Sequence, residues 1–128
     1  MKNKYLLSLL WVIVSGFGVL MAQEIAIIPQ PAHLIVKNES FKFGKQLKVC
    51  IASYRGDSVT LVFDSFKDDF QKATGIKVTS VRSEAKAGIV LSVNQTLAPE
   101  AYKLDVSPKQ IRIEAARPAG FYYALQTL

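Results

Sequence analysis

The stretch YKLDVSPKQIRIEA, residues 102–115, carries the clearest fold signal in the sequence. Apolar and charged residues alternate on both sides of the central SPKQ, residues 107–110. Such alternation is typical of strands with one buried face, and SPKQ is a typical turn. The stretch therefore predicts a β-hairpin that packs its apolar face on a core and exposes its charged face.

Further strands precede this hairpin. Residues 47–51, 76–81 and 88–93 are rich in β-branched residues or alternate apolar with polar ones. The stretch from His33 to Phe43 indicates one or two short strands around a polar turn. Together these segments predict a mainly antiparallel sheet that is covered on one side only.

A helix is expected over residues 58–74, where the apolar spacing changes to three and four. Asp57 is a suitable N-cap and Gly75 a suitable C-terminal stop. An apolar stripe at this spacing covers one face of a helix and indicates packing on a sheet. The stripe consists of Val59, Val62, Phe66, Phe70 and Ala73, widened by Leu61 and Phe63.

A second helix is expected from Pro118, a favoured first helical residue, to the end of the sequence. No Gly or Asn stop and no basic last turn follow its apolar stripe, so we expect a helix that is cut at the C-terminus. The fold class predicted is α+β, with two helices packed on one face of the sheet. The stripe consists of Phe121, Ala124, Leu125 and Leu128.

Length and composition limit the function classes. The sequence has 128 residues, whereas a (β/α)₈ barrel takes about 250, so no barrel enzyme fits within it. The single Cys50 and single His33 exclude a disulfide framework within the chain and the usual zinc-site spacings. We therefore expect a globular domain without a metal or a cofactor.

Residues 1–22 differ in composition from the rest of the sequence. Lys2 and Lys4 precede an uncharged apolar stretch, residues 5–20. A basic start followed by a short apolar run is typical of a secretory signal peptide, and a membrane span needs roughly 18 to 20 apolar residues. We expect cleavage after residue 22 and a secreted or periplasmic domain of residues 23–128. The alternative is an uncleaved membrane anchor.

The positive charge of the chain is modest and dispersed. Removing Lys2 and Lys4 from the 16 basic residues leaves 14 against 10 acidic ones, a net charge of +4. Nucleic-acid-binding proteins gather basic residues on one face or interleave them with aromatic ones, which this sequence does not do. We therefore expect no nucleic-acid partner.

Residues of catalytic type form no recognisable site in the sequence. His33 has no nearby acidic residue, and Cys50 lies on a predicted strand without a neighbouring His. Asp68 and Asp69 are neighbours on a helix and point about 100° apart, so they cannot act as a carboxylate pair. We predict no catalytic, cofactor-binding or metal-binding residue.

Two other features point to surface roles or packing. Tyr122 and Tyr123 could stack on a sugar, but the start of a helix must bury part of its surface, so we assign them to packing. Asn38 and Asn94 match the acceptor pattern for N-glycosylation, which has meaning only in a host that glycosylates.

The first and last segments of the folded part carry a family resemblance. The sequence has Ile-Ile-Pro-Gln-Pro at residues 27–31 and closes with AGFYYALQTL at residues 119–128. With the strands between them, these segments resemble the N-terminal domain of β-N-acetylhexosaminidases of glycoside hydrolase family 20. In that family the closing helix leads into the catalytic barrel. Ala124 stands where the family more often has Gly.

The resemblance implies an accessory domain whose partner in cis is the catalytic barrel of a hydrolase. Members of the family hydrolyse terminal non-reducing N-acetylhexosamine residues in glycans, with a Glu and a preceding Asp of the barrel as catalytic residues. The sequence contains no Asp-Glu dipeptide, so none of its residues receives that role. The chain alone is therefore expected to be inactive, and glycan substrates would be reached only through the barrel.

Two alternatives stay open at this point. One is the related accessory domain of another glycosidase, of the α-glucuronidase or family 84 type. The other is a free-standing carbohydrate-binding module, which would need exposed aromatic residues on the open face of the sheet. The hairpin places Lys, Asp, Arg and Glu on that face, which argues against the binding module.

Overall fold

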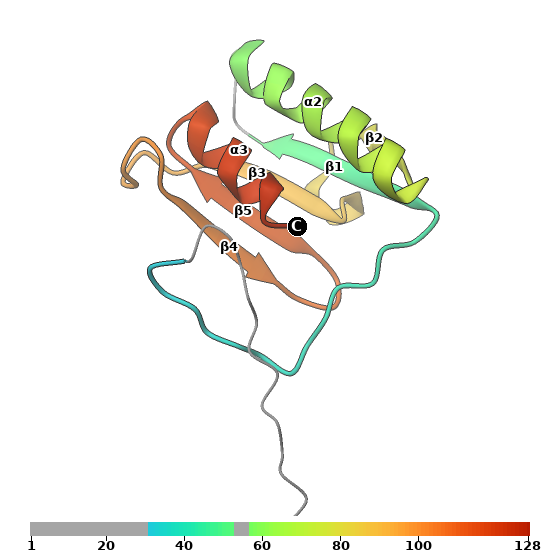
Figure 1. Cartoon of the computed structure of the whole chain (residues 1–128), viewed down its shortest axis with the longest axis horizontal. Coiled ribbons are helices and arrows are strands. Elements are labelled where there is room, and N and C mark those ends of the chain that lie inside the picture. The colour runs from blue at the N-terminus through green and yellow to red at the C-terminus, as the bar shows by residue number, and fades with distance from the viewer. Residues whose placement is uncertain (1–30, 53–56) are drawn as a thin grey trace, which may run out of the picture. The chain divides into compact units, whose positions relative to one another are not determined.

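The computed structural model describes residues 31–52 and 57–128 (Figure 1). The predicted signal peptide, residues 1–22, lies outside the described residues. Among the described helices, none is both long and apolar enough to cross a membrane. In chain order the elements are β1 (Gln46–Ala52), α2 (Asp57–Thr74), β2 (Lys77–Ser80), the 3₁₀ helix η2 (Glu84–Lys86), β3 (Ile89–Val93), β4 (Tyr102–Val106), β5 (Ile111–Ala115) and α3 (Pro118–Gln126).

Five strands form one mixed sheet in the order β2-β1-β3-β5-β4. β1 pairs in parallel with β2 and with β3, and β3 pairs in parallel with β5. The β4–β5 pair is antiparallel, places Leu104 opposite Ile113, and is the hairpin that the sequence predicts. The predicted α+β class is confirmed. The sheet is mixed, so the expectation of a mainly antiparallel sheet is wrong.

The connections explain the strand directions. Helix α2 connects β1 to β2, and a strand–helix–strand crossover brings the chain back in the same direction. The turn at residues 107–110 instead reverses the chain, and its backbone N–H at Ser107 donates to the Gln110 carbonyl at 3.1 Å. Apolar alternation identifies the buried face of a strand, but it carries no information about the direction of the neighbouring strand.

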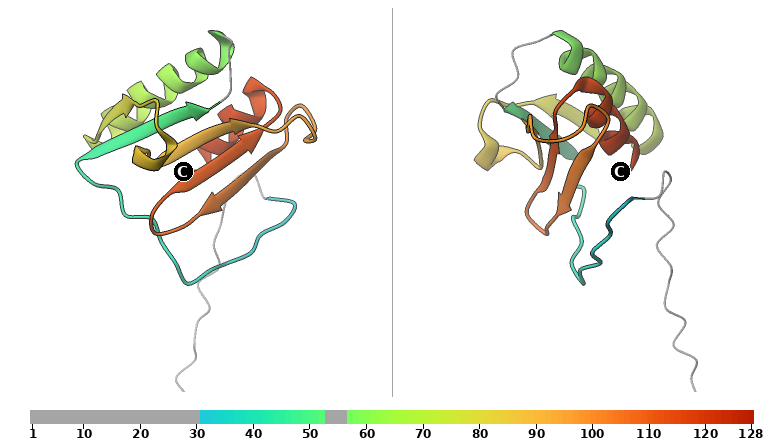
Figure 2. Two further views of the ribbon diagram at one scale, coloured as in Figure 1. Left: turned by 180° about the vertical axis from the view of Figure 1, so that it is seen from behind. Right: turned by 90° about the vertical axis from the view of Figure 1, so that its left-hand side faces the viewer.

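Helices α2 and α3 cover the same face of the sheet, as expected (Figure 1 and Figure 2). Phe63 and Phe66 of α2 and Phe121 of α3 are buried between the two layers. Their apolar contacts with the sheet supply the main stabilisation of the domain. The strands contribute Leu47, Val49, Val78, Ile89, Leu91, Ile111, Ile113 and Ala115 to this core.

Helix α2 has the amphipathic pattern that the sequence predicts, with two differences. Val59 and Phe63 are buried, but Leu61 is 69% exposed and Ala73 is also exposed. At 100° per residue, Leu61 lies about 200° around the helix from Val59 and points away from the sheet. Leu61 therefore does not widen the buried stripe, and this part of the prediction is wrong.

Gly75 ends α2, as predicted, in a left-handed conformation with φ of 73°. Its N–H donates to the Gln71 carbonyl at 2.9 Å. No atom would obstruct a Cβ at this position, so the cost of a substitution is conformational. Gly75→Ala should lower the free energy of unfolding by about 1–2 kcal/mol in urea titrations, and Gly75→Asn by less, because Asn tolerates this region better. Equal stability of Gly75→Ala and the parent chain would contradict this account of the helix end.

Thr127 contacts both the last turn of α3 and strand β4. The Thr127 hydroxyl donates to the Tyr123 carbonyl at 2.9 Å and lies 3.0 Å from the Tyr102 hydroxyl on β4. Phe121, Ala124 and Leu125 are buried as predicted, whereas Leu128 follows the helix and is 36% exposed. The Thr127 hydroxyl thus bonds to one of the last carbonyls of the helix and connects α3 to β4.

Residues 31–45 contain no strand, so the strands expected between His33 and Phe43 are not formed. Three apolar residues follow one another in this segment, and a strand would turn at least one of them away from any single face. All three are exposed, and Ile35 is exposed to 82%. These residues are Leu34, Ile35 and Val36.

Side-chain contacts hold this segment on the domain. The Lys37 ammonium lies 2.8 Å from the Asp105 carboxylate on β4. Further along, the Phe43 ring lies 5.3 Å from that of Phe70, near the end of α2. Aromatic pairs at this separation stabilise packing beyond the area they bury. Phe41, whose ring lies 5.1 Å from that of Phe43, also packs against the main core. The segment is therefore placed by side-chain contacts, without a sheet ladder.

The second face of the sheet is partly covered, although we expected it to be open. Residues 81–88, which include η2, cross this face on the side away from α2 and α3 (Figure 2). Ala87 of this segment packs with Cys50 and Val90 in a small separate cluster. The sheet therefore has one large core under the helices and one minor core behind it.

Candidate functional site

The sheet face opposite the helices is mainly polar, and we call it the open face. Its composition decides whether it could stack on sugar rings, because stacking needs aromatic side chains. None of the strand residues on this face is aromatic, and the structure therefore gives no support to a carbohydrate-binding module here. They are Gln46, Lys48, Cys50, Ala52, Lys77, Thr79, Val90, Ser92, Lys103, Asp105, Arg112 and Glu114.

The charges of the hairpin on the open face are balanced by opposite charges. Lys103 lies opposite Glu114 across the ladder, and Asp105 lies opposite Arg112. Cross-strand pairs of opposite charge stabilise a sheet by a few tenths of a kcal/mol up to about 1 kcal/mol. The ion pairs that form are with other segments: Asp105 pairs with Lys37, and Arg112 pairs with Glu84.

Asn94 belongs to the same polar surface. Its side-chain amide donates to the Glu114 carboxylate at 2.8 Å, while its oxygen accepts from the Thr96 hydroxyl at 2.6 Å. The second acceptor motif, at Asn38, is exposed. Both asparagines thus have ordinary surface environments, and their glycosylation stays a prediction.

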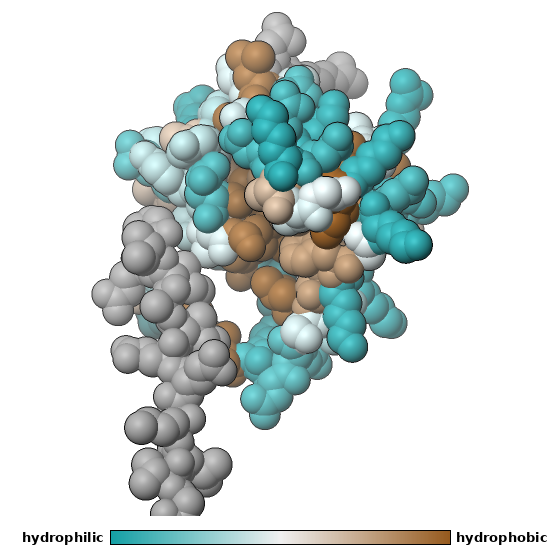
Figure 3. Space-filling model, turned by 45° about the vertical axis from the view of Figure 1, so that its right-hand side comes forward, coloured by the Kyte–Doolittle hydropathy of each residue, from teal (hydrophilic) through white to brown (hydrophobic). Residues whose placement is uncertain are grey.

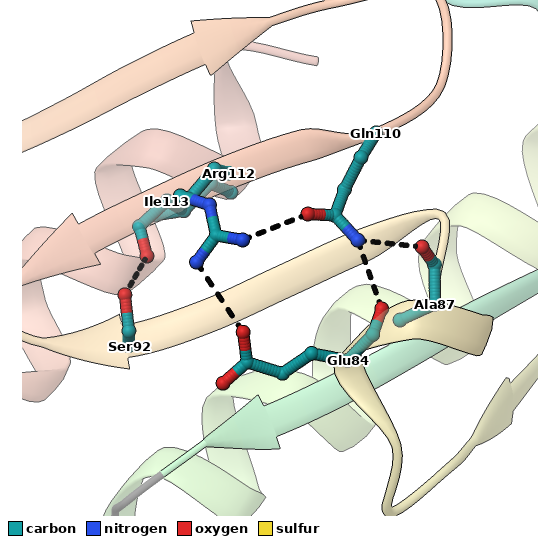
Figure 4. Close-up of polar contacts among 6 residues, drawn as sticks. All are labelled: Glu84, Ala87, Ser92, Gln110, Arg112 and Ile113. Atoms are coloured by element: carbon teal, nitrogen blue, oxygen red, sulfur yellow. Dashed lines mark hydrogen bonds and ion pairs between the residues drawn. The ribbon is translucent and has the colours of Figure 1, made fainter.

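A polar network attaches η2 to β5 (Figure 4). The Gln110 side-chain amide donates to the carbonyls of Glu84 and Ala87 at 2.9 and 3.0 Å. The Arg112 guanidinium donates to the Gln110 side-chain oxygen at 3.0 Å and lies 3.4 Å from the Glu84 carboxylate. In the sequence, Gln110 is the last residue of the SPKQ turn, and no local pattern signals this contact.

Three of the residues of catalytic type named above lie on the surface. His33, Asp68 and Asp69 are exposed, the last two on the outer part of α2. Within residues 31–52 and 57–128, no three His, Cys, Asp or Glu side chains come close enough to hold a metal ion. The prediction that none of these residues is catalytic stays a prediction.

Cys50 is buried on β1, on the face away from the helices, as its position in the alternation predicts. Burial raises the pKa of the Cys50 thiol, and the Glu84 carboxylate raises it further. A raised pKa keeps the thiol protonated near neutral pH, and the protonated form is a poor nucleophile. The geometry thus agrees with a structural thiol.

Three large side chains of the helix layer are exposed, and we call them together the helix-layer patch: Leu61 on α2, and Tyr122 and Tyr123 on α3. Tyr122 and Tyr123 are 45% and 37% exposed, and their rings lie 5.7 Å apart. Our assignment of these tyrosines to packing is therefore wrong. A count at 100° per residue from buried Phe121 would have placed Tyr122 at about 100° and Tyr123 at about 200°, off the buried stripe.

Hydrophobic side chains also gather in the middle of the face seen in Figure 3, on the side where α2 ends. Hydrophilic side chains border them above, to the right and below in this view. Apolar surface with a polar rim is typical of an interface with another protein domain. The helix side of the molecule, and not the open face, therefore has the character of a contact surface.

Comparison with protein families identifies the fold and its context. The model of glycosyl hydrolase family 20, domain 2, matches residues 24–128. The comparison with curated proteins gave no match.

Solved structures agree with the family match. An exo β-N-acetylglucosaminidase of family 20 from Vibrio harveyi, in complex with N-acetylglucosamine, is 32% identical over 77% of this chain, with a TM-score of 0.67. The N-acetyl-β-hexosaminidase of Streptomyces plicatus (24% identical, 80% of this chain, TM-score 0.68) and the β-N-acetylhexosaminidase of Bacteroides fragilis (24%, 79%, 0.62) share the fold.

The chain spans only 15% of the Vibrio harveyi protein and 20% of each of the other two. The similarity therefore concerns one domain of much longer enzymes. The family model nevertheless covers nearly all of this chain, including every helix and strand of the described residues. The chain belongs to glycosyl hydrolase family 20, and residues 24–128 are its domain 2.

Proposed function

We propose that this chain is the non-catalytic N-terminal domain of a secreted β-N-acetylhexosaminidase, an enzyme that hydrolyses terminal non-reducing N-acetylhexosamine residues in glycans. The domain acts by packing on the catalytic barrel of the same polypeptide. The observation that carries the proposal is the contrast between its two surfaces. The open face has balanced charges, whereas the helix-layer patch exposes Leu61, Tyr122 and Tyr123.

The side chains of the helix-layer patch would gain free energy from being covered. A large apolar side chain contributes roughly 1.5–3 kcal/mol when it moves from water into a packed interface. Tyrosine adds a hydroxyl that can bond to the partner, and it is enriched in interfaces for this reason. The balanced charges of the open face would instead have to be desolvated, which disfavours docking there.

Fusion of a family 20 catalytic domain behind Leu128 tests the docking of the helix-layer patch. Leu61→Lys should lower the unfolding free energy of this domain within the fusion by about 1.5–3 kcal/mol, because the side chain would be buried there. The isolated chain should keep its thermal midpoint, because Leu61 is 69% exposed and Lys has a similar helix propensity. Calorimetry on both proteins measures the two effects.

Lys109→Asp is the matched control, since Lys109 is exposed in the turn between β4 and β5. It should change neither the fusion nor the isolated chain by more than about 0.5 kcal/mol. If Leu61→Lys also left the fusion unchanged, the outer face of the helices would not be the docking surface. An effect of Lys109→Asp on the fusion alone would assign docking to the turn side instead.

Export is part of the proposal and rests on the composition of residues 1–22. A basic start and a short apolar run direct a chain into the secretory route and are removed afterwards. N-terminal sequencing of the exported protein should therefore begin at Gln23 or within a few residues of it. A product that still starts at Met1 and needs detergent for extraction would show a membrane anchor instead.

A further inference from the structure

Residues 81–88, which we call the strap, are fixed to the open face mainly at their two ends. The Val81 N–H donates to the Val49 carbonyl, and the Gly88 N–H donates to the Lys48 carbonyl, both at 2.8 Å. Between these points the strap leaves the sheet ladder and forms η2. Its middle therefore depends on side-chain contacts to stay on the sheet.

The apolar contact between the strap and the sheet is small. Ala87 is the strap residue that is buried, Val81 is half-buried, and none of the η2 residues is buried. Beneath them lie Cys50 and Val90, which are 2% and 0% exposed. Burial of one methyl group stabilises the fold much less than burial of the phenylalanine rings in the main core does.

Gln110 makes the main polar contact with the middle of the strap. Its side-chain amide donates to two strap carbonyls, those of Glu84 and Ala87, and its oxygen is fixed by Arg112 (Figure 4). The Arg112–Glu84 ion pair, at 3.4 Å and about half exposed, adds little, because exposed pairs contribute at most about 1 kcal/mol. Gln110 is thus the side chain that holds the middle of the strap on the sheet, and we call it the latch.

We propose that the strap is a locally opening segment of the fold, latched by Gln110, which uncovers the Cys50 thiol while both helices stay packed on the sheet. Segments with few buried apolar contacts and exposed hydrogen bonds open at a lower free energy than the whole domain unfolds. The strap meets these conditions. It also lies on the face opposite the helix-layer patch, so its opening is independent of the docking proposed above.

Labelling of the thiol by a soluble aromatic disulfide, dithiobis(nitrobenzoate), measures this opening. The Cys50 thiolate attacks the reagent's disulfide, forms a mixed disulfide and releases one thionitrobenzoate anion, whose absorbance is followed. Cys50 is the only cysteine of the chain, so the signal has one source. At low urea the labelling rate should depend only weakly on urea, because local opening exposes little surface.

Gln110→Ala should raise the labelling rate about tenfold, the effect of losing roughly one net hydrogen bond to the strap. Lys109→Ala, its exposed neighbour in the turn, should leave the rate unchanged. Phe66→Leu, which weakens the core on the other face, should lower the thermal midpoint without changing the rate at low urea.

Two results would overturn the proposal. The first is a labelling rate that rises as steeply with urea as global unfolding does, or that rises with Phe66→Leu, since the thiol would then be reached only by unfolding of the whole domain. The second is a Gln110→Ala rate equal to that of Lys109→Ala. The urea dependence of the parent chain decides the first point even if the Gln110 variant fails to fold.

Discussion

Phe121→Ala should lower the free energy of unfolding by about 3–5 kcal/mol, the largest effect that we expect from a single substitution in this chain. Phe121 is 1% exposed and lies between α3 and the sheet, so its removal leaves a cavity in the main core. A domain of this size has a total stability of roughly 5–15 kcal/mol, and such a loss would leave it marginally folded. Urea or thermal unfolding followed by circular dichroism measures the change.

Tyr122→Ala is the matched control for this prediction. It removes an aromatic ring one residue further along the same helix, but Tyr122 is 45% exposed. The expected loss is within about 0.5 kcal/mol, because exposed positions contribute little to stability. Equal losses for the two variants would mean that α3 does not present the buried face described above.

Gly120→Ala should destabilise the domain by about 1–3 kcal/mol, although Ala is the better helix former. A Cβ at Gly120 would lie 2.5 Å from the Ala101 carbonyl oxygen and 2.9 Å from the Ala115 Cβ. Both distances are shorter than van der Waals contact, so α3 would have to move away from β5 and from the residue before β4. Hydrogen exchange should show weaker protection in α3 as well as a lower global stability.

Gly44→Ala is the control for Gly120→Ala. It places the same methyl group 3.9 Å from its nearest neighbour, the Gln46 carbonyl oxygen, and should change the stability by less than about 0.5 kcal/mol. If the two variants had the same free energy of unfolding, α3 would not approach the sheet as closely as described here.

The hairpin and the helices could be predicted from the sequence, because each has its own period. Alternation places Leu104 and Ile113 on one face, and the three-and-four spacing places Phe63 and Phe66 on another. Strand direction depends on which segments pair, and these segments lie far apart in the sequence. This applies to the parallel pairs among β1, β2, β3 and β5. For this reason the mixed sheet became apparent only in the structure.

The surfaces were harder to predict than the elements. Hydrophobicity alone suggested that Leu61, Tyr122 and Tyr123 face the core, yet their angular position on the helix places them outside it. The contact of Gln110 with the strap joins residues more than twenty positions apart, and no local pattern encodes it. The prediction that no residue of this chain is catalytic rests on motif spacing, which can be judged from the sequence. It stays a prediction.

An activity assay on the purified chain tests the central claim, that this family 20 domain carries no active site of its own. Residues 23–128, shown to be folded by thermal unfolding, are incubated with an aryl β-N-acetylglucosaminide, with the catalytic-domain fusion as the positive control. We predict no release of the chromophore above buffer from the isolated domain and clear release from the fusion. Turnover by the isolated domain that disappears when His33, or Asp64 on the exposed side of α2, is replaced would contradict the claim.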